Sequence, residues 1–303
     1  SIATPSRARN FQIVEISPRE LDGLPLEPSE PRMRQIPFLL MFAVGLIVLA
    51  GPLEAQRFYR GYSKVRLGQG LPDRPGGFTF CRLAYASVRR DSSGSGWSTD
   101  FPQADRNLPT RLSQLTPTTV TSWSHGEPGF AIVRVTDPEV YQCPFLMATD
   151  VGELGFNEAE VAAMRNFLFK GGFFWVDDFW GARSWDQFSR QIMRVLPEFE
   201  IVELPLDHSL FEIVYSVPMV PQIPSINSWR RMRGGTSELG PDSATPHMRA
   251  ILDDTGRILV LITHNTDISD GWEREGEDPE FFYRFSPDAY AIGINVVIWM
   301  LTH

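Results

Sequence analysis

Two adjacent carboxylates end a strongly apolar segment, and they are the side chains best placed to do chemistry. Residues 171–181 read GGFFWVDDFWG, so the apolar run ends at Asp177 and Asp178. Ligands of open α/β sheets bind beyond the carboxyl ends of the strands, where a carboxylate can act as a base, hold a hydroxyl or bind a cation. Because successive strand residues point to opposite faces, we expect one aspartate to face a ligand crevice and the other to brace the loop.

Two further segments carry side chains that could share this crevice. Asp207 precedes His208, which could act as an oriented base; the alternative is a helix start capped by Asp207. The most acidic stretch is residues 264–280, which follows a predicted buried strand. Its spacing does not match an EF-hand loop, so no metal site and no cofactor are predicted, and a solvated acidic loop is the alternative.

These considerations define the predicted site. The catalytic candidates are Asp177, Asp178 and His208. The predicted ligand-binding residues are Trp180, Gly181, Asn265, Asp267, Asp270 and Trp272.

The elements that must position these residues alternate between strands and helices. Residues 173–177 lack polar alternation, which is typical of a strand buried on both faces of a parallel sheet. Asn157 and Glu160 form a capping pair for a helix that ends before two glycines. Two other helices are predicted to begin at Ser184 and at Ser286. Predicted strands cover residues 78–87, 130–135, 145–148 and 201–204, another helix covers 104–115, and residues 249–253 and 257–263 form a hairpin. The pattern predicts an α/β fold with a mostly parallel sheet and helices on both faces.

Composition narrows the class of protein. The chain has 303 residues, 43% of them hydrophobic and 21% charged, and a net charge of −9. That charge argues against a nucleic-acid partner. Cys81 and Cys143 match no zinc or redox spacing, and we expect two separate buried thiols, with a disulfide as the alternative in an exported protein.

The N-terminal region predicts export. Residues 33–55 resemble a signal peptide or a signal anchor, with an apolar run over residues 36–50 that could hold the protein at the membrane. Residues 1–32 are predicted to be a disordered extension or to follow from a mis-assigned start. Residues 56–75 are predicted to be a linker. The remaining residues, 76–303, are predicted to form the α/β domain. We expect this domain to be located in the periplasm or cell envelope.

The domain resembles a bacterial family, the domain of unknown function numbered four-one-five-nine. The matching segments are Arg82-x-x-Tyr85, Trp97-Ser98-Thr99-Asp100, Asp137-Pro138, Pro144-Phe145-Leu146, Asp177-Asp178, Asp267-x-x-Asp270-Gly271-Trp272 and Gly293-x-Asn295. The resemblance implies a fold similar to class I glutamine amidotransferases. Those enzymes carry a cysteine where this chain has Asp177-Asp178, so the resemblance implies no glutamine hydrolysis through a thiolate.

The leading hypothesis is an exported domain that binds a polar ligand, such as a carbohydrate or a cell-wall fragment. One alternative is a carboxylate- or metal-dependent hydrolase that uses Asp177 or Asp178 as its base. The other is a non-catalytic envelope module that docks a membrane-protein partner through the proline-rich residues 216–247.

Overall fold

The computed structural model describes residues 71–72, 76–90 and 94–303. The predicted extension, the predicted leader and nearly all of the predicted linker lie outside the described residues. In the part of the chain that is described, no helix has the length and apolar character needed to cross a membrane.

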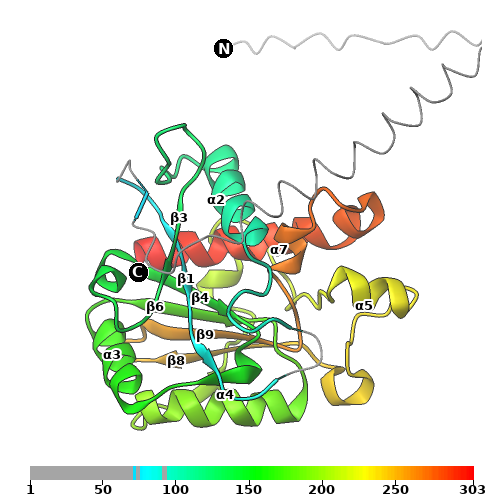
Figure 1. The fold of residues 1–303 in the computed structure, drawn as a ribbon. Coiled ribbons are helices and arrows are strands. Elements are labelled where there is room, and N and C mark those ends of the chain that lie inside the picture. The colour runs from blue at the N-terminus through cyan, green and yellow to red at the C-terminus, as the bar shows by residue number, and fades with distance from the viewer. Residues whose placement is uncertain (1–70, 73–75, 91–93) are drawn as a thin grey trace, which may run out of the picture. The chain divides into compact units, whose positions relative to one another are not determined.

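Seven of the described strands form one mixed sheet in the order β3-β1-β4-β6-β9-β8-β7 (Figure 1). The pairs from β3 across to β9 are parallel, and β8 is antiparallel to both of its neighbours. The strands are β1 (Phe80–Leu83), β3 (Phe130–Val133), β4 (Phe145–Thr149), β6 (Phe173–Asp177), β7 (Ile201–Glu203), β8 (His247–Leu252) and β9 (Ile258–His264). A separate antiparallel pair joins β2 (Ala86–Ser87) to β5 (Leu154–Gly155). The mostly parallel sheet and the β8–β9 hairpin confirm the prediction.

Helices cover both faces of this sheet (Figure 1). On one face, α2 (Gln103–Leu115) and α7 (Pro279–Thr302) contribute Leu108 and Ile292 to a core with Phe145 and Trp175. On the other face lie α3 (Glu158–Phe169) and α4 (Gly181–Val195), whose core side chains include Phe188. Two shorter helices are α5 (Ile226–Arg231) and α6 (Asp270–Glu273). Short 3-10 turns cover Pro138–Gln142, Val151–Glu153, Ser209–Phe211 and Gly240–Ser243.

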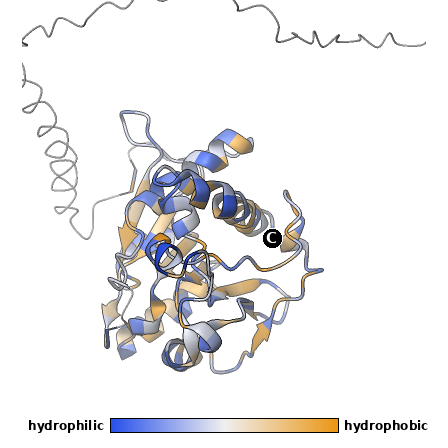
Figure 2. Ribbon diagram, turned by 90° about the vertical axis from the view of Figure 1, so that its right-hand side faces the viewer, coloured by the Kyte–Doolittle hydropathy of each residue, from blue (hydrophilic) through white to orange (hydrophobic). Residues whose placement is uncertain are grey.

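Strand β6 shows why the centre of the sheet is apolar. All five of its residues are buried. Phe173 and Trp175 pack into the core on the side of α7, whereas Phe174 and Val176 pack on the side of α4. Figure 2 shows hydrophobic residues along the strands and hydrophilic ones on the outer faces of the helices. Burial on both faces explains the missing polar alternation and confirms its interpretation.

The helix starts confirm one prediction and correct two. Asn157 and Glu160 form the predicted reciprocal capping box of α3. Helix α4 begins at Gly181 and not at Ser184, because side chains from distant segments accept its first N–H groups. Helix α7 begins at Pro279 with Asp278 as its cap, so Ser286 lies inside the helix.

The two cysteines form a disulfide that links β1 to Cys143, two residues before β4. The Sγ atoms of Cys81 and Cys143 are 2.10 Å apart, and both residues are fully buried. This corrects the prediction of two separate thiols. The spacing of 62 residues gave no signal, because the pairing is produced by the β1–β4 contact.

Candidate functional site

At the carboxyl ends of three neighbouring strands the backbone takes a left-handed conformation. The residues after β4, β6 and β9 are Asp150, Asp178 and Asn265, with φ of 54°, 52° and 60°. Aspartate and asparagine tolerate this region better than other non-glycine residues. Asp150 N donates to Asp178 O and Asn265 N donates to Phe179 O, both at 3.0 Å. The three turns are therefore tied together at one edge of the sheet.

Asp177 is the bracing member of the acidic pair. It is completely buried at the end of β6. Its Oδ1 accepts from Thr263 Oγ1 at 2.5 Å, and its Oδ2 accepts from both N and Oγ of Ser269 at 2.9 Å. Burial raises the pKa of Asp177 to about 6, although these hydrogen bonds oppose the shift. Both carboxylate oxygens are thus used to join β6 to β9 and to the residue before α6.

Asp178 is the more accessible member. It is half-buried, and its Oδ1 accepts from Trp180 Nε1 at 3.0 Å. Burial, followed by the nearby charges of Asp100 and Asp150, raises its pKa well above the usual range. One member of the pair thus braces the fold and the other is half-buried, while a ligand crevice in front of Asp178 stays a prediction.

The start of α4 lies beside this pair and involves three residues of the predicted site: Trp180, Gly181 and Asn265. Trp180 is 5% exposed. Asn265 Oδ1 accepts from Gly181 N at 2.8 Å, and Asn265 Nδ2 donates to Thr245 O at 2.9 Å. The polar atoms of the Asn265 side chain are therefore engaged in holding the chain.

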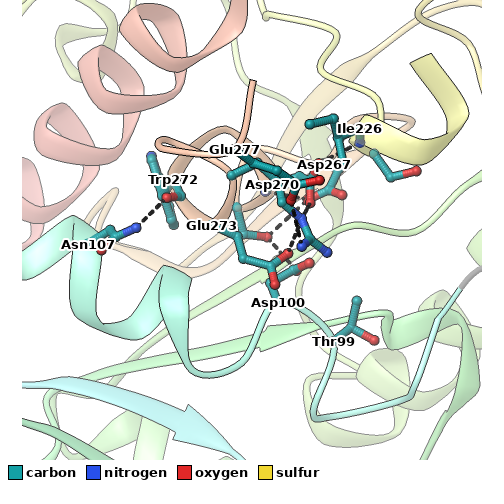
Figure 3. A network of polar contacts seen from close by, with 12 residues as sticks. Thr99, Asp100, Asn107, Ile226, Asp267, Asp270, Trp272, Glu273 and Glu277 are labelled. Atoms are coloured by element: carbon teal, nitrogen blue, oxygen red, sulfur yellow. Dashed lines mark hydrogen bonds and ion pairs between the residues drawn. The ribbon is translucent and has the colours of Figure 1, made fainter. Parts of the chain in front are cut away.

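Asp100 meets two aspartates of a distant segment, Asp267 and Asp270, next to Asp177. Single carboxylate oxygens of Asp100, Asp267 and Asp270 all lie within 4.8 Å of one another, and all three residues are buried (Figure 3). Glu273, whose side chain is 8% exposed, lies beside them. We refer to Asp100, Asp177, Asp267, Asp270 and Glu273 as the acidic centre.

Backbone groups hold the acidic residues in place. Asp270 Oδ2 accepts from Ile226 N at 2.7 Å, so the first residue of α5 contacts the centre. Asp267 Oδ1 accepts from Asp270 N at 2.8 Å. Asp100 has a φ of 64°, a conformation that a non-glycine residue keeps only when its surroundings fix it. Backbone hydrogen bonds and the local backbone conformation thus fix the positions of these carboxylates.

The hydroxyl of Ser269 lies at the middle of the acidic centre. Its Oγ is 2.9 Å from Asp100 Oδ2, 2.9 Å from Asp177 Oδ2 and 3.2 Å from Asp267 Oδ1. A hydroxyl has one hydrogen to donate. It can therefore donate to only one of these three carboxylates at a time, although Asp177 and Asp267 also accept from backbone N–H groups.

The raised pKa values of the acidic centre indicate that its carboxylates are buried close together with little positive charge nearby. Burial and the charge of Asp270 raise the pKa of Asp100 to about 7, although Arg82 opposes the shift. Burial, followed by the charges of Asp100 and Asp270, raises the pKa of Glu273 to about 9. The pKa of Asp267 is also raised well above normal by burial and by its acidic neighbours.

Two arginines supply positive charge near the centre. Arg274 pairs with Asp270 at 3.2 Å and with Glu273 at 3.0 Å. Arg82 is fully buried and forms a bidentate pair with Asp105; its Nη1 donates to Thr99 O at 2.8 Å. Arg82 therefore fixes the residue before Asp100, while its charge is shared with Asp105.

The side chains of two residues of the predicted site, Trp272 and His208, do not contribute to the acidic centre. Trp272 is completely buried and packs edge-on against Trp175 at 5.5 Å, so its ring belongs to the core and offers no face for stacking. His208 Nδ1 accepts from Leu210 N at 3.2 Å, and its ring lies 5.6 Å from Trp299 near the end of α7. Burial and His303 lower the pKa of His208, and none of its contacts reaches the acidic centre.

Asp100, Ser269, Glu273 and Arg274 were absent from the predicted site. Asp100 is 167 positions before Asp267, and no local spacing connects them. The one feature of the sequence that could have pointed to Asp100 is its place in the segment Trp97–Asp100, which is among the segments on which the family resemblance rests. Within residues 264–280, the alternative of a solvated acidic loop does not hold for α6, which turns Asp270 and Glu273 inward.

Residues 79–301 match the family described as Domain of unknown function (DUF4159). None of the curated proteins matches the chain.

Proposed function

The chain belongs to the DUF4159 family, and from its acidic centre we propose that it is a binding domain that holds a hard divalent cation and, through it, a polar ligand. The observation that carries the proposal is the approach of Asp100, Asp267 and Asp270 oxygens to within 4.8 Å of one another. Oxygen-only ligand sets favour Mg²⁺, Ca²⁺ or Mn²⁺. This extends the sequence-based expectation, which named Asp267 and Asp270 as ligand-binding residues but no metal.

The electrostatics of the centre support a cation. Burying several carboxylates close together is unfavourable unless they are protonated or paired with positive charge. Arg274 pairs with Asp270 and Glu273, and the single hydroxyl of Ser269 lies within 3.2 Å of oxygens of Asp100, Asp177 and Asp267. A divalent cation held by Asp100, Asp267 and Asp270 would offset this concentration of negative charge without added protons. It would also offer coordination positions to ligand hydroxyls, as in a carbohydrate or a cell-wall fragment.

The proposal is tested by calorimetric titration of the purified protein with Mg²⁺, Ca²⁺ and Mn²⁺ at pH 7.5. We expect saturable binding of at least one ion, with a rise in Tm, because a ligand that binds only the folded state stabilises it. The double variant Asp267→Asn/Asp270→Asn should lose this binding. Asp254→Asn is the matched control, since Asp254 is an exposed aspartate in the β8–β9 turn. Binding that is absent in the wild type, or unchanged in the double variant, would refute the cation site.

A polar-ligand screen then follows from the same protein. Glycan and peptidoglycan fragments should raise Tm further in the presence of the cation, and EDTA should remove that effect.

Hydrolysis is the second candidate function, and the observation that favours it is the half-buried Asp178 with its raised pKa. Turnover of any fragment that survives in Asp178→Asn would exclude this candidate.

We further propose that the fold is similar to class I glutamine amidotransferases and that the domain is exported to the periplasm or cell envelope. The mostly parallel sheet with helices on both faces supports the first. The Cys81–Cys143 disulfide supports the second, because disulfides persist mainly in oxidising compartments. Fractionation of the native host, with the protein found only in the cytosol, would contradict export.

A further inference from the structure

The guanidinium of Arg274 contacts three carboxylates at once. Its Nε is 3.2 Å from Asp270 Oδ1 and 3.0 Å from Glu273 Oε2, while its Nη1 donates to Glu277 Oε2 at 3.1 Å. The first two carboxylates belong to the acidic centre. Glu277 lies outside it, with a side chain that is 40% exposed. Arg274 therefore links the centre to the surface.

The inner contacts of Arg274 are incompletely satisfied. Nε carries one hydrogen, and it makes a directed hydrogen bond to Asp270 only. Glu273 Oε2 is buried and has no directed hydrogen bond, although it lies at ion-pair distance from Nε. A buried carboxylate oxygen in this situation gains from a better-placed positive charge.

Arg274 and a cation would compete for the same carboxylate. Asp270 Oδ2 accepts from Ile226 N and Asp270 Oδ1 accepts from Arg274 Nε, so Oδ1 is the oxygen on which a cation would meet the guanidinium. The Arg274 side chain is 28% exposed, and Glu277 lies one turn further along the chain. A rotation of the Arg274 side chain could release Asp270 and Glu273 while the contact with Glu277 is kept.

We infer that Arg274 is a built-in counter-cation of the acidic centre, which a bound divalent cation displaces toward Glu277. The inference rests on the proposed cation site and adds its regulation. In the cation-free protein the guanidinium pairs with Asp270 and lies at ion-pair distance from Glu273. In the loaded protein the metal takes over these carboxylates, so the affinity for the cation includes the cost of moving Arg274.

The test compares Ca²⁺ binding by the wild type and by Arg274→Gln, measured by calorimetry at about 0.15 M ionic strength. Removing a competing positive charge a few ångströms from the site should tighten Ca²⁺ binding by roughly tenfold. In EDTA, the variant should have a lower Tm than the wild type, and Ca²⁺ should raise its Tm by more. A purely structural role predicts weaker binding instead, because the centre would be less well ordered.

Two controls separate the outcomes. Arg190→Gln removes an equal charge from the exposed face of α4 and should leave the Ca²⁺ affinity unchanged. Glu277→Gln removes the outer partner of Arg274 and should weaken binding several-fold. If the wild type binds Ca²⁺ and Arg274→Gln binds it no more tightly, the inference is overturned while the cation site stands. If neither protein binds Ca²⁺, the proposed function and the inference are overturned together.

Discussion

Asp177 and Asp178 are neighbours in sequence, yet they have different roles. The left-handed backbone at Asp178 turns the chain directly after β6. Asp177 stays in the strand, where three donors use its oxygens, and Asp178 points to a half-buried position with one donor. A double aspartate at a strand end here combines a structural brace with a half-buried carboxylate that accepts from the Trp180 ring.

The two roles predict different effects on stability. Asp177→Ala should lower the free energy of unfolding by about 1–3 kcal/mol, because it leaves Ser269 N–H in the interior without an acceptor. Asp178→Ala should cost less, since Trp180 Nε1 is the one donor it leaves behind. Urea denaturation of both variants at pH 7 provides the comparison. An equal or smaller loss in Asp177→Ala would contradict the bracing role.

At the level of elements, local sequence was a good guide where local contacts decide the structure. The Asn157–Glu160 box predicts α3 because both of its hydrogen bonds lie within four residues. Local sequence does not predict the start of α4, because Asn265 and Asp242 accept from its first N–H groups across long sequence distances. It also fails for α7, where Pro287 lies within the helix on its exposed side, so the missing hydrogen bond faces solvent.

The start of α7 can be tested with a pair of variants. Asp278→Ala should lower Tm by roughly 2–4 °C, because Glu280 N and Phe281 N lose their side-chain acceptor. Ser286→Ala should be neutral or slightly stabilising, because Ser286 Oγ is buried without a hydrogen-bond partner. Thermal unfolding followed by circular dichroism measures both. A larger loss in Ser286→Ala would favour the helix start predicted from the sequence.

At the level of the whole molecule, the sheet order assembles the site. The sequence predicted the strands and the acidic pair, and parallel strands place their carboxyl ends at one edge. It could not predict that Asp100, which lies between β2 and α2, meets Asp267 after β9, because no local rule sets that distance. The acidic centre is thus a product of topology, whereas its individual aspartates are visible in the sequence.

The acidic centre predicts an unusual dependence of stability on pH. The folded-state pKa values of Asp100 and Asp177 are raised to about 7 and about 6, from an ordinary value of 3.8. Between about pH 4 and pH 7 the folded state therefore binds more protons than the unfolded state, and stability falls as the pH rises. In EDTA, we expect a higher Tm at pH 5 than at pH 8, measured by scanning calorimetry.

Excess divalent cation should reverse this loss at pH 8, where Asp100 and Asp177 are ionised. It should have little effect at pH 5, where protons occupy the same groups. A Tm in EDTA that is equal or higher at pH 8 would show that these carboxylates do not titrate in this way.

The proline-rich residues 216–247 have a consequence for any search for a docking partner. Ile223 N donates to Thr266 Oγ1, Asp267 N donates to Ile223 O, and Ile226 N donates to Asp270. Excising this segment would dismantle the acidic centre along with any docking surface, and a failed pull-down would then be uninterpretable. Partner binding should instead be mapped by point changes at its outward side chains, such as Met219, which is 67% exposed.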